Sequence, residues 1–135
     1  MTRVVVPVRY PLSTHSKTTL SEAIRIAEER SAELTVLHVD LYQSGKDVSR
    51  ADLKQAVESE FGPLERTRYV VRRGFLVEET ILEEVAADEA DIVVIGAKQA
   101  GRWRQMIRRV LDDPDIESFL RQELDSTVIS VRADE

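Results

Sequence analysis

The sequence contains no cysteine and only two histidines, His15 and His38, which lie far apart along the chain. The absence of cysteine excludes disulfides, thiolate nucleophiles and cysteine metal sites. Two separated histidines give no metal cluster and no cysteine–histidine dyad. There is also no Walker loop, no GxGxxG motif and no serine–glycine-rich loop after the first predicted strand. These absences favour a protein that is not an enzyme.

Acidic residues outnumber basic ones, and lysine is scarce. The 135 residues carry a formal net charge of −6, with 15 arginines and only 4 lysines. An acidic chain is a poor partner for a phosphate backbone, so no nucleic-acid binding is expected. Acidic, lysine-poor composition also fits a salt-rich cytoplasm. No apolar run approaches the length of a membrane span, and Met1-Thr2-Arg3 leads straight into a strand, so we expect a cytoplasmic protein without a membrane partner.

Apolar and β-branched residues are concentrated in short runs that predict strands. The first, second and fourth runs are almost continuously apolar, which is typical of parallel strands covered on both faces. The third run contains more arginine and is therefore expected nearer a sheet edge. The five predicted strands are residues 3–8, 33–41, 66–73, 92–96 and 127–132.

The segments between these strands carry apolar residues at helical spacing. Thr19 with Glu22 can form a capping box for the first helix, and Ser49 with Asp52 can form one for the second. Gly74 turns the chain into the third. Strands and helices that alternate in this way predict one α/β domain over residues 1–135, a doubly wound five-stranded parallel sheet with helices on both faces.

The stretch between the fourth and fifth strands is the most informative. It is predicted to hold a turn with two glycines, Gly96 and Gly101, then a basic helix, then a short helix after Asp113-Pro114. The basic helix has an apolar stripe that includes Trp103, which is expected to pack in the core. Its arginines either form a solvated face that pairs with Asp112, Asp113 and the acidic third helix, or contribute to an anion site; they are Arg102, Arg104, Arg108 and Arg109.

Several motifs, taken in order, resemble the universal stress protein family, a small group with an adenine-nucleotide-binding type of α/β fold. They are VVVPV at the start, LTVLHV in the second strand, the Gly74 to Ile81 spacing, DIVVIGAK in the fourth strand and the terminal TVISVR. The resemblance covers the full length of the chain. It implies the strand order 3-2-1-4-5 and often a dimer paired through the fifth strands.

Nucleotide-binding members of that family carry glycines after the fourth strand and then Gly-Ser or Gly-Thr, whose amides and hydroxyl donate to phosphate. This chain keeps Gly96, has Gln99 at the second position and has Gly101 shortly after. Counted back from the last strand, Pro114 and Asp115 stand where Gly-Ser would be. Proline has no amide to donate. An aspartate a few ångströms from a triphosphate would repel it by about 1 kcal/mol or more.

The first strand departs from the family pattern as well, because Arg9 stands where nucleotide binders carry an aspartate near the adenosine. We therefore expect no ATP bound in the usual family mode and no resident cofactor. ATP, AMP or another anion at the carboxyl edge of the sheet remains the alternative. The candidate residues for such a site are Pro7, Val8, Arg9, Val39, Asp40, Gly96, Lys98, Gly101 and Arg102.

Four functional hypotheses follow. The first is a non-enzymatic stress-adaptation module with a degenerate nucleotide site. The second is an ATP- or AMP-responsive switch in which Gly96, Lys98 and Gly101 build a modified phosphate loop. The third is a weak hydrolase or adenylating enzyme, which would depend on Lys98. The fourth is an accessory module that binds an unknown partner protein through Arg104 and Arg108 of the basic helix.

His38 and Asp40 can each be explained by a structural role instead of a functional one. His38 lies within a buried strand and is expected to be a hydrogen-bonded core residue. Asp40, at the end of that strand, either meets a ligand or caps the loop that follows.

The terminal strand is expected to pair with its copy in a second chain. Residues Thr127 to Arg132 alternate β-branched side chains without proline or glycine, and an edge strand leaves amides unpaired. Antiparallel pairing would satisfy these amides and bury Val128 or Val131, giving a homodimer. The alternative is an edge protected by Arg132 alone.

Overall fold

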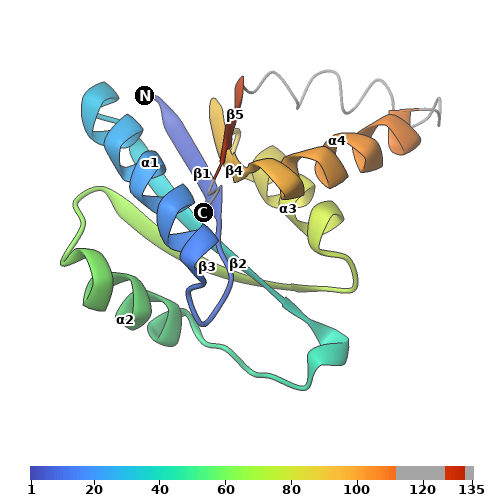
Figure 1. Ribbon diagram of the computed structural model, residues 1–135, viewed down its shortest axis with the longest axis horizontal. Coiled ribbons are helices and arrows are strands. Elements are labelled where there is room, and N and C mark those ends of the chain that lie inside the picture. Colours follow the sequence, from blue (N-terminus) through green and yellow to red (C-terminus); the bar gives the residue numbers. More distant parts are fainter. Residues whose placement is uncertain (112–126, 133–135) are drawn as a thin grey trace.

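Five parallel strands form a single sheet at the centre of the protein (Figure 1), in the order β3-β2-β1-β4-β5. The computed structural model describes residues 1–111 and 127–132. This order and the parallel pairing confirm the predicted fold. The strands are β1 (Arg3–Pro7), β2 (Glu33–Leu41), β3 (Thr67–Gly74), β4 (Ile92–Gly96) and β5 (Thr127–Val131). The short helix predicted after Asp113-Pro114 lies outside the described residues.

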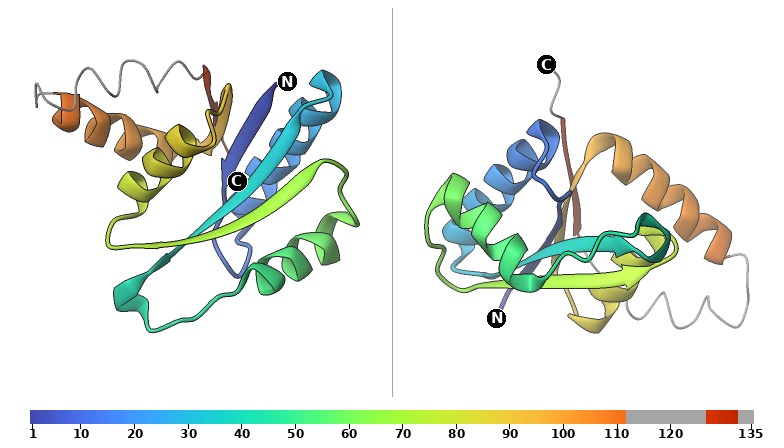
Figure 2. Two further views of the ribbon diagram at one scale, coloured as in Figure 1. Left: turned by 180° about the vertical axis from the view of Figure 1, so that it is seen from behind. Right: turned by 90° about the horizontal axis from the view of Figure 1, so that it is seen from below.

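Helices cover both faces of the sheet, as predicted (Figure 2). One face carries α1 (Thr14–Arg30) and α2 (Arg50–Phe61), and the other carries α3 (Val77–Ala87) and α4 (Ala97–Leu111). A one-turn 3-10 helix, η1 (Tyr42–Ser44), follows β2. The two pairs lie on opposite faces because the crossovers are right-handed. A helix therefore covers one face when the chain moves one way across the sheet and the other face when it moves the opposite way.

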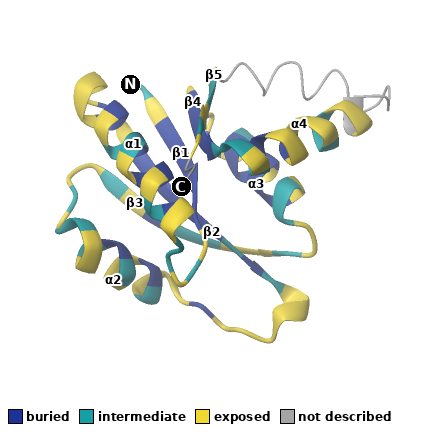
Figure 3. Ribbon diagram, in the orientation of Figure 1, coloured by how far each residue is buried: buried dark blue, intermediate teal, exposed yellow. Residues whose placement is uncertain are grey.

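Alternating side chains of the strands divide the core into two apolar layers. Val4 and Val6 of β1 face α1 and α2, whereas Val5 between them packs with Ile81 of α3 and Trp103 of α4. All five side chains are at most 1% exposed. In Figure 3, burial is concentrated in the central strands, and exposed residues lie on the outer sides of the helices. Trp103 is thus a packing residue, as the sequence predicts.

The start of α2 confirms the predicted capping box. The Ser49 hydroxyl accepts a hydrogen bond from the Asp52 amide at 3.0 Å, and the Asp52 carboxylate accepts one from the Ser49 amide at 3.0 Å. These bonds satisfy two amides that a helix start leaves unpaired and lower the pKa of Asp52. The helix ends at Gly62, whose φ of 78° favours glycine.

The start of α1 differs from the prediction. The helix begins at Thr14, and Ser13 is its cap: the Ser13 hydroxyl accepts from the Ser16 amide at 3.1 Å. Thr19, predicted to cap the helix, lies inside it and donates its hydroxyl to the His15 carbonyl one turn earlier. The predicted capping box of Thr19 with Glu22 is therefore wrong, because Ser13 with Ser16 offers an earlier cap.

Helix α3 buries two carboxylates that the apolar pattern does not predict. Glu84 is 3% exposed and Asp88 is 8% exposed. The Arg72 Nε donates to Glu84 Oε1 at 2.7 Å, and Arg68 forms ion pairs with both acids. The Thr35 hydroxyl adds a hydrogen bond to Asp88 at 3.0 Å. Arginines of an edge strand thus neutralise acids on the helix that covers it.

The two edges of the sheet are β3 and β5. The edge position of β3 confirms the prediction made from its arginine content. Arg50, at the start of α2, donates its Nε to the backbone carbonyl of Tyr69 in β3 at 3.1 Å. A side chain therefore occupies one of the backbone acceptors of this edge strand.

Across residues 1–111 and 127–132, no helix combines the length and apolar character that crossing a bilayer requires.

Candidate functional site at the carboxyl edge of the sheet

The strand order reverses between β1 and β4, which lie side by side in the middle of the sheet. From β1 the chain leaves toward α1 on one face, and from β4 it leaves toward α4 on the other. In open parallel sheets, ligands bind in the crevice that such a reversal opens at the carboxyl ends of the strands. The sequence places its candidate residues at this edge, so each can be compared with its position in the structure.

At the end of β1, the backbone is largely engaged within the protein. Val8 is 7% exposed; its amide donates to the Leu37 carbonyl at 2.8 Å and its carbonyl lies 3.1 Å from His38 Nδ1. Pro7, the last residue of β1, is buried and pairs with Leu37 of β2. The side chain of Arg9 is exposed, but its amide donates to Ser16 Oγ at 2.9 Å. Of these predicted site residues, only the Arg9 side chain is open to solvent.

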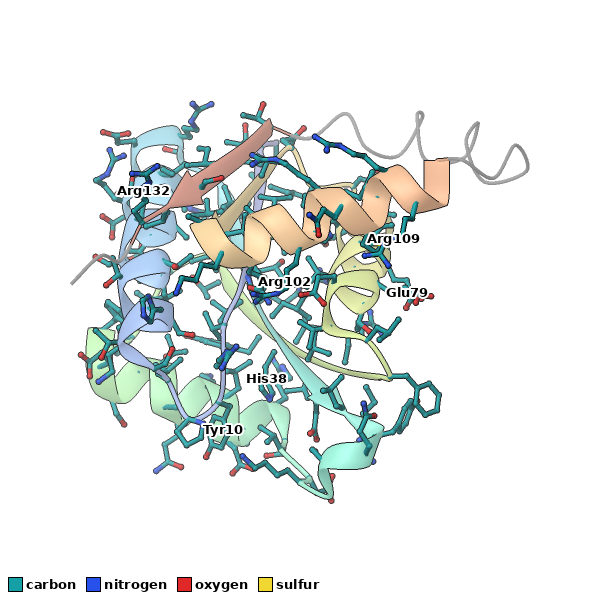
Figure 4. All side chains as sticks on the ribbon, turned by 45° about the vertical axis from the view of Figure 1, so that its right-hand side comes forward. Tyr10, His38, Glu79, Arg102, Arg109 and Arg132 are labelled. Carbon is teal, nitrogen blue, oxygen red and sulfur yellow. The ribbon has the colours of Figure 1, made fainter. Side chains whose placement is uncertain are left out.

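His38 is a core residue, as predicted. The residue is 9% exposed, and its Nδ1 is hydrogen-bonded to the Val8 carbonyl. The ring of Tyr10 lies over it, with centroids 6.0 Å apart, and Figure 4 shows the two side chains together below β1. This contact ties the loop after β1 to β2.

Asp40, at the end of β2, caps the loop that follows. It is 3% exposed, and its carboxylate accepts hydrogen bonds from Ser44 Oγ and from the Val48 amide, both at 3.2 Å. Arg73 of β3 lies 4.0 Å from the same carboxylate. These hydrogen bonds are the ones that the loop-capping alternative for Asp40 predicts. Its neighbour Val39 is half-buried against the α3 and α4 layer.

The end of β4 differs most from the expectation. The chain passes from Gly96 directly into α4 at Ala97, so the predicted turn with two glycines is wrong. Gly101 lies inside the helix, and a Cβ added to it would meet no atom within 4 Å. A Cβ on Gly96 would meet only Thr19 Oγ1, at an ordinary 3.7 Å. Neither glycine is required by a positive φ or by a close contact with another described residue.

Of the three cations predicted to gather at this edge, Arg102 is tied to the neighbouring helix. Its Nε donates to Glu78 Oε1 of α3 at 2.9 Å. Lys98, in the first turn of α4, is exposed, and no ion pair to it is formed within residues 1–111 and 127–132. Arg104, further along α4, donates to Ser130 Oγ of β5 at 3.4 Å. Arg102 therefore contacts α3, in keeping with the pairing to the acidic third helix predicted as one alternative, and Arg104 contacts β5.

The sequence reasoning missed two residues at this edge, Ser16 and Thr19. Ser16 is 7% exposed and its hydroxyl holds the Arg9 amide; Thr19 is 3% exposed and faces Gly96 across the gap between α1 and β4. The spacing of Ser13 and Ser16 was the available signal, because it is the spacing of a helix cap. The proposed Pro114 and Asp115 substitution for Gly-Ser lies outside the described residues, as do Asp112 and Asp113.

What the edge can do chemically follows from these contacts. The first turn of α4 leaves backbone amides without partners inside the helix, and these amides and Lys98 favour an anion. The polar groups at the ends of β1 and β2 are mostly used by the protein itself. Together, the fold and this edge define a doubly wound α/β domain of the nucleotide-binding type.

Comparison with known proteins identifies the group within that class. The model of the Universal stress protein family matches residues 1–112, and this chain belongs to that family. No curated protein was found to match the sequence.

Solved structures confirm the fold. A universal stress protein in complex with cAMP aligns with a TM-score of 0.60 at 15% identity, over 96% of this chain and 97% of that one. The universal stress protein UspA from Lactobacillus plantarum aligns with a TM-score of 0.60 at 20% identity, over 97% of each chain. A universal stress protein from Archaeoglobus fulgidus aligns with a TM-score of 0.57 at 24% identity, over 98% of this chain and 45% of that one.

Proposed function

We propose that this universal stress-type protein is a non-enzymatic stress-adaptation module whose carboxyl-edge site does not hold ATP in the usual family mode. The observation that carries the proposal is the start of α4 at Ala97, directly after β4. A phosphate loop needs several consecutive amides free to turn toward the ligand. Here the second turn of α4, including Gly101, is helical, and its amides are used by the helix.

The ends of β1 and β2 support the same proposal. The Arg9 amide is bonded to Ser16, the Val8 carbonyl to His38, and the Asp40 carboxylate to the loop after β2. A nucleoside at this edge would have to replace these bonds, and buried polar groups that lose partners destabilise the protein. The aspartate that family binders carry after β1 is replaced by Arg9, whose guanidinium cannot accept a hydrogen bond from a ribose.

The second candidate is an ATP- or AMP-responsive switch. It is favoured by the first-turn amides of α4, which a helix leaves without intrahelical partners, and by the exposed Lys98 beside them. A similar structure was solved in complex with cAMP. In this hypothesis only the first turn of α4 donates to phosphate, and the ligand is held more weakly than by a full loop.

Calorimetric titration with Mg-ATP, AMP and cAMP distinguishes the two candidates. We expect no binding in the micromolar range, and no nucleotide in the mass spectrum of the purified, denatured protein. Micromolar ATP binding that is lost in Lys98→Ala and kept in Lys54→Ala would establish the switch instead. Lys54 is the matched control because it is an exposed lysine on α2, away from this edge.

A non-enzymatic role predicts phosphate release from ATP no faster than in a mock preparation. Release above that level, decreasing in Lys98→Ala, would contradict the proposal. The assay is independent of the titration, because slow turnover is detectable even where binding is too weak to measure.

We also infer that two copies pair through β5. This strand ends the sheet, and Val128, Ile129 and Val131 are each only half-buried in a single chain. Pairing would satisfy the unpaired amides of the edge and cover these side chains. Sedimentation equilibrium should give twice the mass of the chain, and Val131→Lys should return it to 15.3 kDa. A wild-type protein that sediments at the mass of one chain would overturn this inference.

A further inference from the structure

Three of the most exposed large hydrophobic side chains meet at one corner of the carboxyl edge. Tyr42 is 54% exposed, Phe75 is 70% exposed and Leu76 is 58% exposed. Tyr42 belongs to η1 after β2, and the other two belong to the connection between β3 and α3, which lies beside η1 in every view (Figures 1 and 2). The two aromatic rings are in contact, with centroids 4.8 Å apart. Tyr42, Phe75 and Leu76 are called the corner patch below.

The fold does not depend on this patch. None of its three side chains belongs to either apolar layer of the core. Apolar groups left in water and gathered together are characteristic of surfaces that bind a partner, and aromatic residues are enriched among the residues that carry the binding energy. The patch is therefore better explained by recognition than by folding.

Hydrogen bonds hold the β3–α3 side of the patch in place. Gln43 Nε2 donates to the Phe75 carbonyl at 3.0 Å, which links η1 to this connection. The Thr80 hydroxyl donates to the Leu76 carbonyl at 2.8 Å. On the η1 side, the buried Asp40 fixes the loop through Ser44 and Val48, as described above. A surface that is ordered before it binds loses less entropy on binding.

An acidic strip continues from the patch along α3. Leu76, Glu79 and Glu83 are three and four residues apart, so they follow one side of the helix, and all three are exposed. Glu78 pairs with Arg102, but residues 1–111 and 127–132 provide no ion pair for Glu79 or Glu83. Figure 4 shows Glu79 on the outer side of α3. An apolar patch followed by unpaired carboxylates is complementary to a segment that carries apolar and basic residues in the same order.

We propose that the corner patch, with Glu79 and Glu83, is a docking surface for a partner protein. The recognised segment presents apolar side chains to the patch and Lys or Arg to the two carboxylates, as a basic amphipathic helix does. A second copy of this chain pairing through the same surface is disfavoured, because a symmetric contact would bring two acidic strips together. An anionic membrane is disfavoured because the acidic strip would repel it. This surface is separate from the site of the proposed function and from β5.

The test uses a synthetic amphipathic helix with Phe and Leu on one face and Lys on the other, and a twin in which Glu replaces every Lys. Amide NMR spectra of the labelled protein should shift on adding the basic peptide, with the largest changes in residues 42–47 and 75–83. Fluorescence anisotropy should show at least tenfold weaker binding for the double variant Phe75→Ser with Leu76→Ser. Its melting temperature should equal that of the wild type, because these side chains lie outside the core.

Charge reversal provides the matched control. Glu79→Lys with Glu83→Lys should weaken the basic peptide at least fivefold and favour the acidic twin. Glu28→Lys with Glu65→Lys changes the net charge equally on exposed residues away from the patch and should leave binding unchanged. The proposal would be overturned if the two charge-reversal variants lost binding equally, if the NMR shifts were centred on other residues, or if no binding were seen at millimolar peptide.

Two further results would assign the patch to another occupant and also overturn the proposal. A smaller sedimenting mass for Phe75→Ser than for the wild type would assign it to a second copy. Wild-type binding to phosphatidylserine vesicles that is lost in Phe75→Ser would assign it to a membrane.

Discussion

Gly74 and Thr80 approach each other so closely that a single added carbon atom would collide. A Cβ on Gly74 would lie 2.1 Å from Thr80 Oγ1, and that hydroxyl is fixed by its bond to the Leu76 carbonyl. Thr80 is 4% exposed and cannot swing into solvent. Glycine is thus required at the end of β3 by space and not by a positive φ. The contact sets how α3 leaves the sheet, and with it the position of the corner patch.

Gly74→Ala is expected to lower the free energy of unfolding by about 2 kcal/mol, through strain at this contact. In the Thr80→Ala background the same change should be milder, because the next atom, Thr80 Cβ, would lie at 3.4 Å. Urea denaturation of the two single variants and the double variant measures this coupling. Strictly additive effects would contradict the proposed collision.

Gly101→Ala should have the opposite effect. Alanine in an exposed helix interior stabilises by about 0.5–1 kcal/mol relative to glycine, and the added Cβ meets no atom within 4 Å. Thermal and urea denaturation should therefore both show a gain. A loss of stability, or a change in any nucleotide titration, would mean that this residue acts as part of a loop.

The ion pairs of Arg72 and Arg25 offer a controlled comparison. Both arginine side chains are 55% exposed, but the Glu84 partner of Arg72 is 2% exposed, whereas the Glu29 partner of Arg25 is 63% exposed. Arg72→Met should lower the free energy of unfolding by about 1–2 kcal/mol. It removes the nearer of the two arginines that pair with the buried Glu84 carboxylate. Arg25→Met should cost less than about 1 kcal/mol, the usual contribution of an exposed pair. Equal losses in urea would show that the burial of Glu84 is unimportant.

Tyr69 should make the protein sensitive to alkali. Burial raises the pKa of Tyr69 from its ordinary value of 10.0 to about 12, and Glu58 adds to the shift. Below pH 10 the ring is neutral in both the folded and unfolded chains, so the full stability is present. Between pH 10 and 12 only the unfolded chain ionises, and stability falls. Tyr69→Phe should reduce this fall in urea titrations across that window.

The same substitution tests a second property of that ring. The Tyr69 hydroxyl is buried and has no hydrogen-bond partner within the part of the chain that the structure describes. Its removal should leave stability at neutral pH unchanged or higher, because an unsatisfied hydroxyl is expensive to bury.

Local patterns were sufficient to predict most of the fold. The apolar run of residues 33–41 coincides with β2, and Ser49 with Asp52 forms the predicted cap, since both signals lie within a few neighbouring residues. The buried carboxylate of Glu84 was not predictable in this way. Its partners come from β3, and only the folded sheet brings Arg68 and Arg72 against α3.

The candidate site was less predictable for the same reason. Asp40 is committed to its loop by contacts with Ser44 and Val48, and a single sequence cannot distinguish a capping carboxylate from a ligand-binding one. Gly101 was interpreted as a turn residue because glycine weakens helices. The apolar stripe around Trp103, anchored in the core, outweighs that local preference and carries the helix back to Ala97.

The two edge strands of the sheet, β3 and β5, differ from each other, and this difference bears on whether copies of the protein can join into a fibre. Growth into a fibre requires every unit to accept a neighbour on two sides. On the β3 side, Arg50 already occupies the Tyr69 carbonyl, and Arg68 and Arg72 are anchored to Asp88 and Glu84. Among the residues that the structure describes, the β3 border is therefore partly obstructed, which disfavours growth on both sides of the sheet.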